Sequence, residues 1–282
     1  MKTVAPFSRR EFIRVSGLGA MGLMTMSATE FGDKPRIHLQ EYPWRTFMDR
    51  NGNDWLDDPV IALQKLVGSP FKSFEPIIDS YEYFEEIRSS IEWSSLDIGS
   101  VYLDAILHEE KEINQRIDQV MEMARFYAKL GTKVIVVNPS PISWDEPKDK
   151  TDNELDAQVE ALDELGKALG ELGMLLAYHN HDVEMRKDAR ELHRMMQKTN
   201  PEYVNYCLDC HWIYRGSGNS SSELFNIINQ YADRIIEIHL RQSSGSIWTE
   251  FFTDGDIDYD KVAKVLKSKN IKPRLVLEQA VE

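Results

Sequence analysis

Short apolar runs alternate with longer amphipathic stretches along the chain after about residue 34. This alternation is typical of βα units, whose strands lie parallel in one sheet. The expected strands are Ile37–Tyr42, Ser73–Ile78, Ile98–Leu103, Val134–Asn138, Met174–Tyr178, Val204–Leu208, Ile235–Leu240 and Arg274–Glu278. Eight such units in about 250 residues predict one α/β domain over residues 34–282, a (β/α)8 barrel.

The stretches between these runs carry helix signals. Asp57 and Asp58 precede Pro59 and a stretch through Val67, which predicts a capped helix with proline in its first turn. Over Glu110–Leu130 apolar residues recur at a spacing of three and four, as in a helix packed on a barrel. Further helices are predicted from Tyr81 and over Asn153–Leu172, Ala189–Lys198, Ser222–Tyr231 and Tyr259–Lys267.

The last predicted strand lies close to the end of the chain. Four residues follow Glu278, which leaves no room for an eighth helix. We therefore expect a barrel that lacks its last helix. The side left uncovered makes a homo-oligomer a candidate assembly.

The first 33 residues have the layout of an export signal. Ser8–Arg14 contains paired arginines followed by Phe-Ile, and an uncharged stretch rich in glycine, alanine and methionine then runs to Ala28. That apolar stretch is about fourteen residues long, too short to cross a bilayer. The pattern resembles a twin-arginine signal, whose pathway exports folded proteins. We predict a signal peptide over residues 1–33, a periplasmic location and no membrane anchor after export.

Charge and cysteine content each weigh against a class of function. The chain has 47 acidic and 33 basic residues, and its formal net charge of −14 repels the phosphates of nucleic acid. Cys207 and Cys210 form a C-x-x-C pattern, but residues three apart in a strand point to opposite faces. We interpret them as two small buried residues.

Metal-ligating side chains gather near the ends of the last four predicted strands. Four of the seven histidines lie there, together with two carboxylates. These side chains are His179, His181, Asp209, His211, His239 and Glu278. Active sites of such barrels lie at the C-terminal ends of the strands, and imidazole and carboxylate are common ligands of divalent ions. The sequence therefore predicts a metal centre at this face.

Several motifs at these strand ends carry a family resemblance. They are Tyr178–Glu184 (YHNHDVE), Leu208–Asp209, Glu237–Leu240, Asp254–Tyr259 and Leu275–Glu278. Together they resemble the sugar phosphate isomerase/epimerase family with the xylose isomerase-like barrel, over roughly residues 36–282. Members of that family hold one divalent ion with Glu, Asp, His and Glu from strands five to eight. Carried over, the last three ligands fall on Asp209, His239 and Glu278.

The first ligand position departs from the family pattern. His179 stands where the family has a glutamate, which in its epimerases is also one of two acid/base carboxylates. The departure weighs against a symmetric proton exchange between two glutamates. A neutral imidazole also favours manganese, cobalt or zinc over magnesium. The resemblance thus implies one divalent ion bound by His179, Asp209, His239 and Glu278.

The other candidates are assigned to proton transfer and to substrate. Glu278 is expected to act as both ligand and base, with His211 or Glu184 as the partner that returns a proton. The expected substrate contacts are His181, Arg241, Trp212, Trp248 and Glu75. Aromatic rings near strand ends suit stacking of a sugar, and no glycine-rich phosphate loop is found, which favours a free sugar or glycoside.

Three functions compete at this point, each with a small carbohydrate as partner. The first, which the sequence favours, is a metal-dependent isomerase or epimerase that abstracts the proton alpha to a metal-bound carbonyl of a sugar or keto-sugar. The second is a lyase or dehydratase of a keto-sugar or keto-glycoside, which the missing glutamate supports. The third is a non-catalytic sugar-binding barrel.

Overall fold

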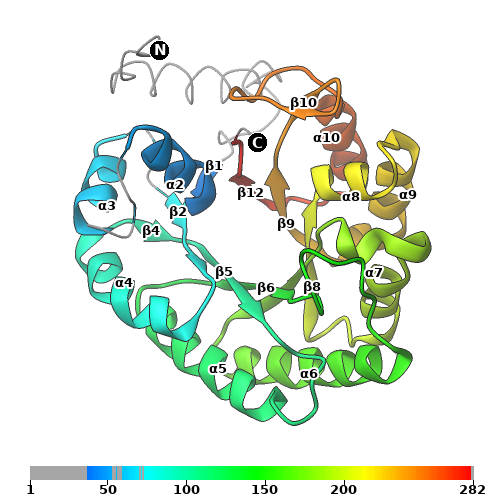
Figure 1. Ribbon diagram of the computed structural model, residues 1–282, viewed down its shortest axis with the longest axis horizontal. Coiled ribbons are helices and arrows are strands. Elements are labelled where there is room, and N and C mark those ends of the chain that lie inside the picture. The colour runs from blue at the N-terminus through cyan, green and yellow to red at the C-terminus, as the bar shows by residue number, and fades with distance from the viewer. Residues whose placement is uncertain (1–36, 53–54, 56–58, 70, 72, 281–282) are drawn as a thin grey trace.

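The computed structural model describes residues 37–52, 55, 59–69, 71 and 73–280, so the predicted signal peptide lies outside the described residues. One sheet is built from β1 (Ile37–Gln40), β2 (Ser73–Glu75), β3 (Ile77–Ile78), β4 (Asp97–Ile98), β5 (Ser100–Ala105), β6 (Val134–Pro139), β7 (Leu175–His179), β8 (Val204–Asp209), β9 (Ile235–Leu240) and β12 (Arg274–Leu277). Figure 1 shows these strands as a ring with helices outside it.

Parallel pairing continues around the whole ring. β1 pairs with β12 on one side and with β2 on the other. β2 and β3 together make the second barrel strand, and β4 and β5 make the third. Because β2 pairs with β4 and β3 pairs with β5, the sheet closes there. The predicted single α/β barrel is confirmed.

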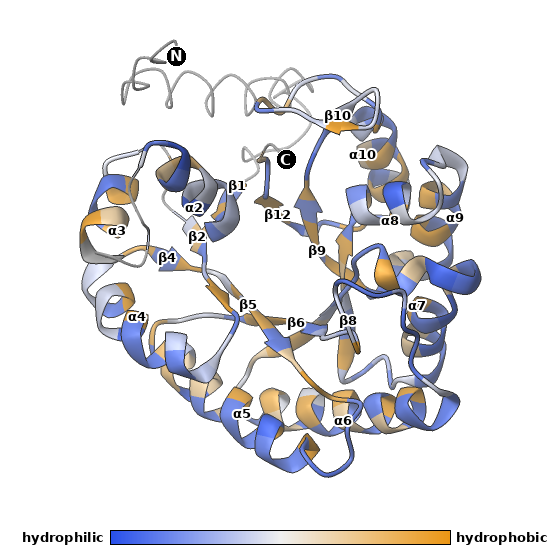
Figure 2. Ribbon diagram, viewed as in Figure 1, coloured by the Kyte–Doolittle hydropathy of each residue, from blue (hydrophilic) through white to orange (hydrophobic). Residues whose placement is uncertain are grey.

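The helices form the outer layer of the barrel. They are α2 (Glu41–Arg50), α3 (Pro59–Val67), α4 (Tyr81–Ser94), α5 (Ile113–Lys129), α6 (Asp152–Glu171), α7 (Arg186–Lys198), α8 (Cys210–Gly216), α9 (Ser221–Tyr231) and α10 (Tyr259–Ser268), with short 3-10 turns η1 (Val183–Met185) and η2 (Ala232–Arg234). In Figure 2 the strands are largely hydrophobic and the outer sides of the helices largely hydrophilic. Among the described residues, none of the helices combines the length and apolarity needed to cross a membrane.

Side-chain caps explain where several helices begin. The Ser80 hydroxyl accepts the Tyr83 N–H at the start of α4. Thr151 and Glu154 form a reciprocal capping box at the start of α6. Such caps satisfy backbone N–H groups that have no partner within the helix. The helix predicted up to Val67 is present as α3, while its predicted cap at Asp57 and Asp58 lies outside the described residues.

Three features differ from the predicted elements. The first strand ends at Gln40 instead of Tyr42, because α2 begins at Glu41 and its third residue, proline, has no N–H to satisfy there. Helix α8 starts directly after β8. A hairpin of β10 (Ser243–Ser244) and β11 (Ile247–Trp248) follows β9, and its two turn residues have positive φ, as two-residue hairpins require. After β12 no helix begins within the residues described, which extend to 280.

Candidate metal centre

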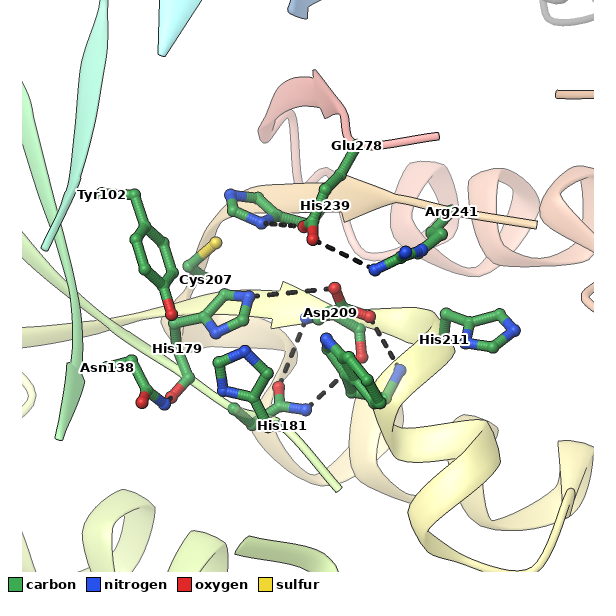
Figure 3. Close-up of polar contacts among 12 residues, drawn as sticks. Tyr102, Asn138, His179, His181, Cys207, Asp209, His211, His239, Arg241 and Glu278 are labelled. Atoms are coloured by element: carbon green, nitrogen blue, oxygen red, sulfur yellow. Dashed lines mark hydrogen bonds and ion pairs between the residues drawn. The ribbon is translucent and has the colours of Figure 1, made fainter. Parts of the chain in front are cut away.

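Four strand ends bring the predicted ligands together. β7, β8, β9 and β12 are consecutive neighbours in the sheet, so their C-terminal ends lie side by side. One ligand atom each from His179, Asp209, His239 and Glu278 lies within 4.8 Å of the others. All four residues are buried, and Figure 3 shows their side chains pointing toward one another. We call these four residues the ligand cluster.

The polar atoms of the ligand cluster fit a bound cation. Both ring nitrogens of His179 and Oδ2 of Asp209 are buried without a hydrogen-bond partner among the described residues. Buried polar atoms normally have partners, so these atoms are suited to a bound group. Burial and the nearby charge of Glu278 raise the pKa of Asp209 to about 6, and a cation would relieve that repulsion. Two imidazoles and two carboxylates suit manganese, cobalt or zinc.

Glu278 lies between His239 of the ligand cluster and the buried guanidinium of Arg241. Its Oε2 is 3.0 Å from His239 Nδ1, and its Oε1 is 3.4 Å from Arg241 Nη1. Burial acts to raise the pKa of Glu278, but hydrogen bonding and charge from His239 and the charge of Arg241 outweigh it and lower the pKa to about 2. The carboxylate is therefore ionised at neutral pH and able to accept a proton.

Arg241 faces the ligand cluster from a cage of aromatic rings. Arg241 is 2% exposed. Its Cζ lies 3.2 Å from the centre of the Trp248 ring and 5.1 Å from the centre of the Tyr42 ring. Within the part of the chain that the structure describes, its Nε and Nη2 have no hydrogen-bond partner. Two N–H donors next to Glu278 can therefore bind oxygen atoms of a substrate.

A row of rings continues from the ligand cluster toward the surface. The His181 ring lies 4.9 Å from that of His179, 5.0 Å from Trp144 and 5.3 Å from Trp212. Trp212 in turn lies 5.2 Å from Trp248. We call Trp144, His181, Trp212 and Trp248 the aromatic wall. Trp144 at its end is 55% exposed, so the wall reaches from the buried cluster to solvent and offers flat apolar faces to a sugar ring.

Comparison with known proteins identifies the family. Residues 65–281 match the family model described as xylose isomerase-like TIM barrel. The chain belongs to the xylose isomerase-like TIM barrel family. A curated relative, the inosose dehydratase of Bacillus cereus (strain AH820), is 29% identical over 220 residues, which cover 68% of this chain and 72% of that protein.

Two solved structures share this xylose isomerase-like fold. A sugar phosphate isomerase/epimerase from Parabacteroides distasonis ATCC 8503 superposes with a TM-score of 0.63 at 16% identity, covering 91% of each chain. A 3-keto-D-glucoside 4-epimerase from E. coli superposes with a TM-score of 0.61 at 15% identity, covering 88% of this chain and 93% of that one. At these identities the likeness concerns the fold.

His211 lies apart from the ligand cluster of this xylose isomerase-like barrel. Figure 3 shows its side chain directed away from the four ligands. The Trp248 Nε1–H donates to His211 Nδ1 at 2.9 Å, and His211 Nε2 lies 2.9 Å from Ser243 Oγ, which donates to Asp256 Oδ2. Burial lowers the pKa of His211 to about 4, so the ring is neutral and its Nε2–H donates to Ser243. The structure thus places His211 where it holds Trp248 in position.

Glu184 is not one of the four clustered ligands. Its Oε2 accepts the backbone N–H of His181 at 2.7 Å, and the residue is fully buried. Burial and the charge of Glu191, a residue of α7, raise the pKa of Glu184 to about 7. Lys150, the nearby cation, is itself bonded to Glu191 at 2.7 Å. Glu184 therefore fixes the turn that carries His181 through Oε2, while its Oε1 is buried without a hydrogen-bond partner among the described residues.

Glu75 lies on the side of the His239 ring opposite Glu278. It is fully buried, and its Oε1 is 3.1 Å from His239 Nε2, the ring nitrogen that does not face Glu278. Two neighbours that the sequence did not single out share this interior, Gln40 and Glu237. Glu237 precedes His239 by two residues, so strand alternation places both on one face, and this signal was present in the sequence.

We expect Ser243→Ala to lower the free energy of unfolding by about 1–2 kcal/mol, because His211 Nε2 would lose a buried hydrogen bond and Asp256 a partly buried one. Urea denaturation measures the change. Ser244→Ala is the matched control, since Ser244 is the exposed neighbour in the same short strand. Equal values for the two variants would contradict the role assigned to the His211 contacts.

Proposed function

We propose that the protein is a divalent-metal-dependent lyase or dehydratase that acts on a keto-sugar or keto-glycoside. The observation that carries the proposal is the convergence of two imidazoles and two carboxylates within 4.8 Å, with unpartnered ligand atoms directed at one another. The aromatic wall and the free donors of Arg241 support a carbohydrate as the substrate.

The residues of the site have separate tasks in this proposal. A divalent ion held by the ligand cluster supplies Lewis acidity, which acidifies the hydrogen alpha to a carbonyl. Glu278 then removes that proton, and Arg241 donates to the carbonyl or hydroxyl oxygen on which negative charge develops. The Cα–H electron pair forms the new C=C bond, and the C–O bond on the next carbon breaks. The leaving oxygen takes from Glu278 the proton that this carboxylate removed, and it departs as water or as the alcohol of a glycoside, which leaves Glu278 ionised again.

We favour elimination over epimerisation because one group, Glu278, can both remove the alpha proton and return it to the leaving oxygen. Epimerisation needs a second group that returns a proton to the opposite face. His211 contacts Trp248 and Glu184 accepts the His181 N–H, whereas the rings of His181 and Tyr102 lie 4.9 and 5.1 Å from that of His179. Burial and the charge of His179 hold the pKa of His181 well below its usual range, so at neutral pH its ring is uncharged and is a weak proton donor.

Isomerase or epimerase activity on a sugar or keto-sugar is the second candidate. It shares the first proton abstraction with the elimination and differs in where the proton goes. The epimerase name of the structural neighbour from E. coli supports it, whereas the dehydratase name of the relative from Bacillus cereus supports elimination. We also propose export by the twin-arginine pathway to the periplasm, on the pattern of residues 1–33.

Proton exchange and product analysis test the proposal together. The protein is prepared metal-free with a chelator and then loaded with manganese, cobalt or zinc. Keto-glucosides and free keto-sugars in deuterium oxide are followed by NMR. We expect loss of water or of the aglycone with loaded protein, and neither loss nor exchange without metal.

The possible outcomes separate the candidates. Deuterium incorporation with inversion or carbonyl migration, and without loss of a group, would favour the isomerase or epimerase. Full activity of the metal-free protein would overturn the metal-dependent mechanism. The parent sugars without a keto group are the control, because they lack the acidified hydrogen.

A further inference from the structure

A group of polar side chains fills the barrel directly beneath His239. Its members come from five strands and are Gln40, Glu75, Ser100, Glu237 and Arg274. We call them the inner polar group. Gln40, Glu75, Ser100 and Glu237 are buried, and Arg274 is partly buried. Interiors of such barrels are dominated by branched apolar side chains, and buried carboxylates are costly unless paired, so this group calls for a specific role.

The two nitrogens of the His239 ring face different surroundings. Nδ1 lies 3.0 Å from Oε2 of Glu278, on the side of the ligand cluster. Nε2 lies 3.1 Å from Oε1 of Glu75 and 3.7 Å from Oε1 of Glu237. An ionised carboxylate only accepts hydrogen bonds, and a neutral imidazole carries one N–H and one lone pair. Carboxylates thus lie on both sides of the ring, but Gln40 Nε2, which can only donate, lies 3.3 Å from Nδ1. With Nδ1 accepting from Gln40, the proton falls on Nε2 and the Nδ1 lone pair faces the side of the cluster.

Glu75 is held in place by its own donors. Ser100 Oγ donates to Oε2 of Glu75 at 2.6 Å, and Gln40 Nε2 donates to Oε1 at 3.2 Å. The same Gln40 nitrogen lies 3.3 Å from His239 Nδ1, so one amide contacts both the carboxylate and the ring. These contacts fix the Glu75 carboxylate relative to the imidazole before any ligand arrives.

The inner polar group holds one cation, Arg274, for its two carboxylates, Glu75 and Glu237. Glu237 Oε2 lies 3.2 Å from the Arg274 guanidinium Nε. Glu75 has the two donors just described and the Nε2 side of His239. Glu75, Glu237 and His239 also lie close enough together to hold a metal ion, so the number of ions bound per chain is part of the test below.

We propose that Glu75 is a positioning residue that acts on the metal centre through His239. Its carboxylate lies 3.1 Å from Nε2, a charge contact without hydrogen-bond geometry, and favours the tautomer with the proton on Nε2, so that Nδ1 is presented as a ligand. The assignment rests on the proposed function, in which the ligand cluster binds a divalent ion. Carboxylate partners of this kind raise ligand basicity, and their loss typically weakens metal binding by about 10- to 100-fold.

Metal affinity of Glu75→Gln tests the assignment without relying on turnover. Cobalt or zinc dissociation constants are measured by competition with a chromophoric chelator, and the visible spectrum of the cobalt-loaded protein reports ligand geometry. We expect an affinity about 10- to 100-fold lower than in the wild type and a changed cobalt spectrum. Glu191→Gln is the matched control, because Glu191 is a half-buried carboxylate of the helix layer bonded to Lys150, and its cobalt spectrum should not change.

Each outcome bears on one claim. No divalent ion on the wild-type protein would refute the proposed function itself. One ion on the wild type and unchanged affinity in a folded Glu75→Gln variant would refute the positioning role. Two ions on the wild type and one on the variant would make Glu75 a ligand of a second site instead. If Glu75→Gln fails to fold, Ser100→Ala gives the same test. We expect its metal affinity to be about fivefold lower, because Glu75 loses one hydrogen bond. Unchanged metal affinity in Ser100→Ala would refute the positioning role of Glu75.

Discussion

Replacing Glu278 with glutamine is expected to reduce kcat by about 10²- to 10⁴-fold, the usual contribution of a positioned acid or base. Glutamine keeps the size of the side chain but cannot accept the substrate proton. It also removes the negative charge that lies 3.4 Å from Arg241 Nη1 and 3.0 Å from His239 Nδ1. We therefore expect weaker metal binding in addition to slower turnover.

Saturating metal separates these two effects of Glu278→Gln. Turnover is measured at rising manganese or cobalt concentration, with far-UV circular dichroism as the check on folding. A rate that recovers fully at high metal would show that Glu278 is a ligand and not the base. Glu85→Gln is the control, because Glu85 is an exposed residue of α4 that pairs with Arg88, and it should behave as the wild type.

Replacing Asp209 with asparagine is expected to weaken metal binding by at least about 100-fold. The loss of a residue that only hydrogen-bonds to a metal ligand already weakens metal binding by up to about 100-fold, and we expect the loss of a ligand to weaken it more. The two carboxylate oxygens of Asp209 have different tasks. Oδ1 accepts the Trp212 N–H at 2.8 Å and caps α8, whereas Oδ2 has no hydrogen-bond partner among the described residues and faces the cluster. Asparagine caps a helix about as well as aspartate, so the fold should be retained.

Asp209→Ala separates the cap from the ligand. Alanine removes both oxygens, so this variant should lose metal affinity as asparagine does. It should also lose about 1 kcal/mol of unfolding free energy relative to Asp209→Asn, the usual value of a capping side chain. Metal titration and urea denaturation of the metal-free proteins measure the two quantities. Metal binding by Asp209→Asn at wild-type affinity would exclude Asp209 as a ligand.

The barrel and the meeting of the ligand cluster were predictable because they depend on local patterns. A continuous β-branched run such as Val134–Val137 reads as a strand covered on both faces, and such runs recur along the chain. The closed pairing of parallel strands then places their C-terminal ends at one face. His179, Asp209, His239 and Glu278 lie at or directly after four such ends, so the sequence alone located them.

The placement of His211 shows where that reasoning stops. Alternation along a strand places His211 on the same face as Asp209, but β8 ends at Asp209 and α8 begins at Cys210. Beyond that point the helical period of 3.6 replaces the strand period of 2, and His211 turns toward Ser243 and Trp248. The hairpin that carries Trp248 returns over α8 through contacts distant in sequence, which local patterns do not report.

Glu75 illustrates a second limit of prediction from sequence, which is how deep in the barrel an interior side chain lies. Alternation correctly directs Glu75 to the barrel interior, and its register partner in β1 is Gln40. Whether an interior side chain reaches the mouth depends on the stagger between neighbouring strands, which follows from closure of the whole barrel. Glu75 consequently lies on the Nε2 side of His239, and Glu278 lies on the Nδ1 side. In the sequence both are glutamates near the end of a predicted strand, so the difference is not visible there.

The hairpin β10–β11 carries Trp248 of the aromatic wall, whereas the strands of the sheet carry the ligand cluster. Three of the four residues of the ligand cluster lie in strands of the sheet, and Glu278 directly follows the fourth strand. Trp248 instead lies in the hairpin, where His211 and Ser243 hold it in position. Residues 243–248 can thus be exchanged for those of a homologue while the ligand-bearing strands stay as they are. Homologues that differ in this segment should therefore differ in the sugars they accept while sharing the same metal, and chimeras that exchange it offer a direct route to altered substrate range.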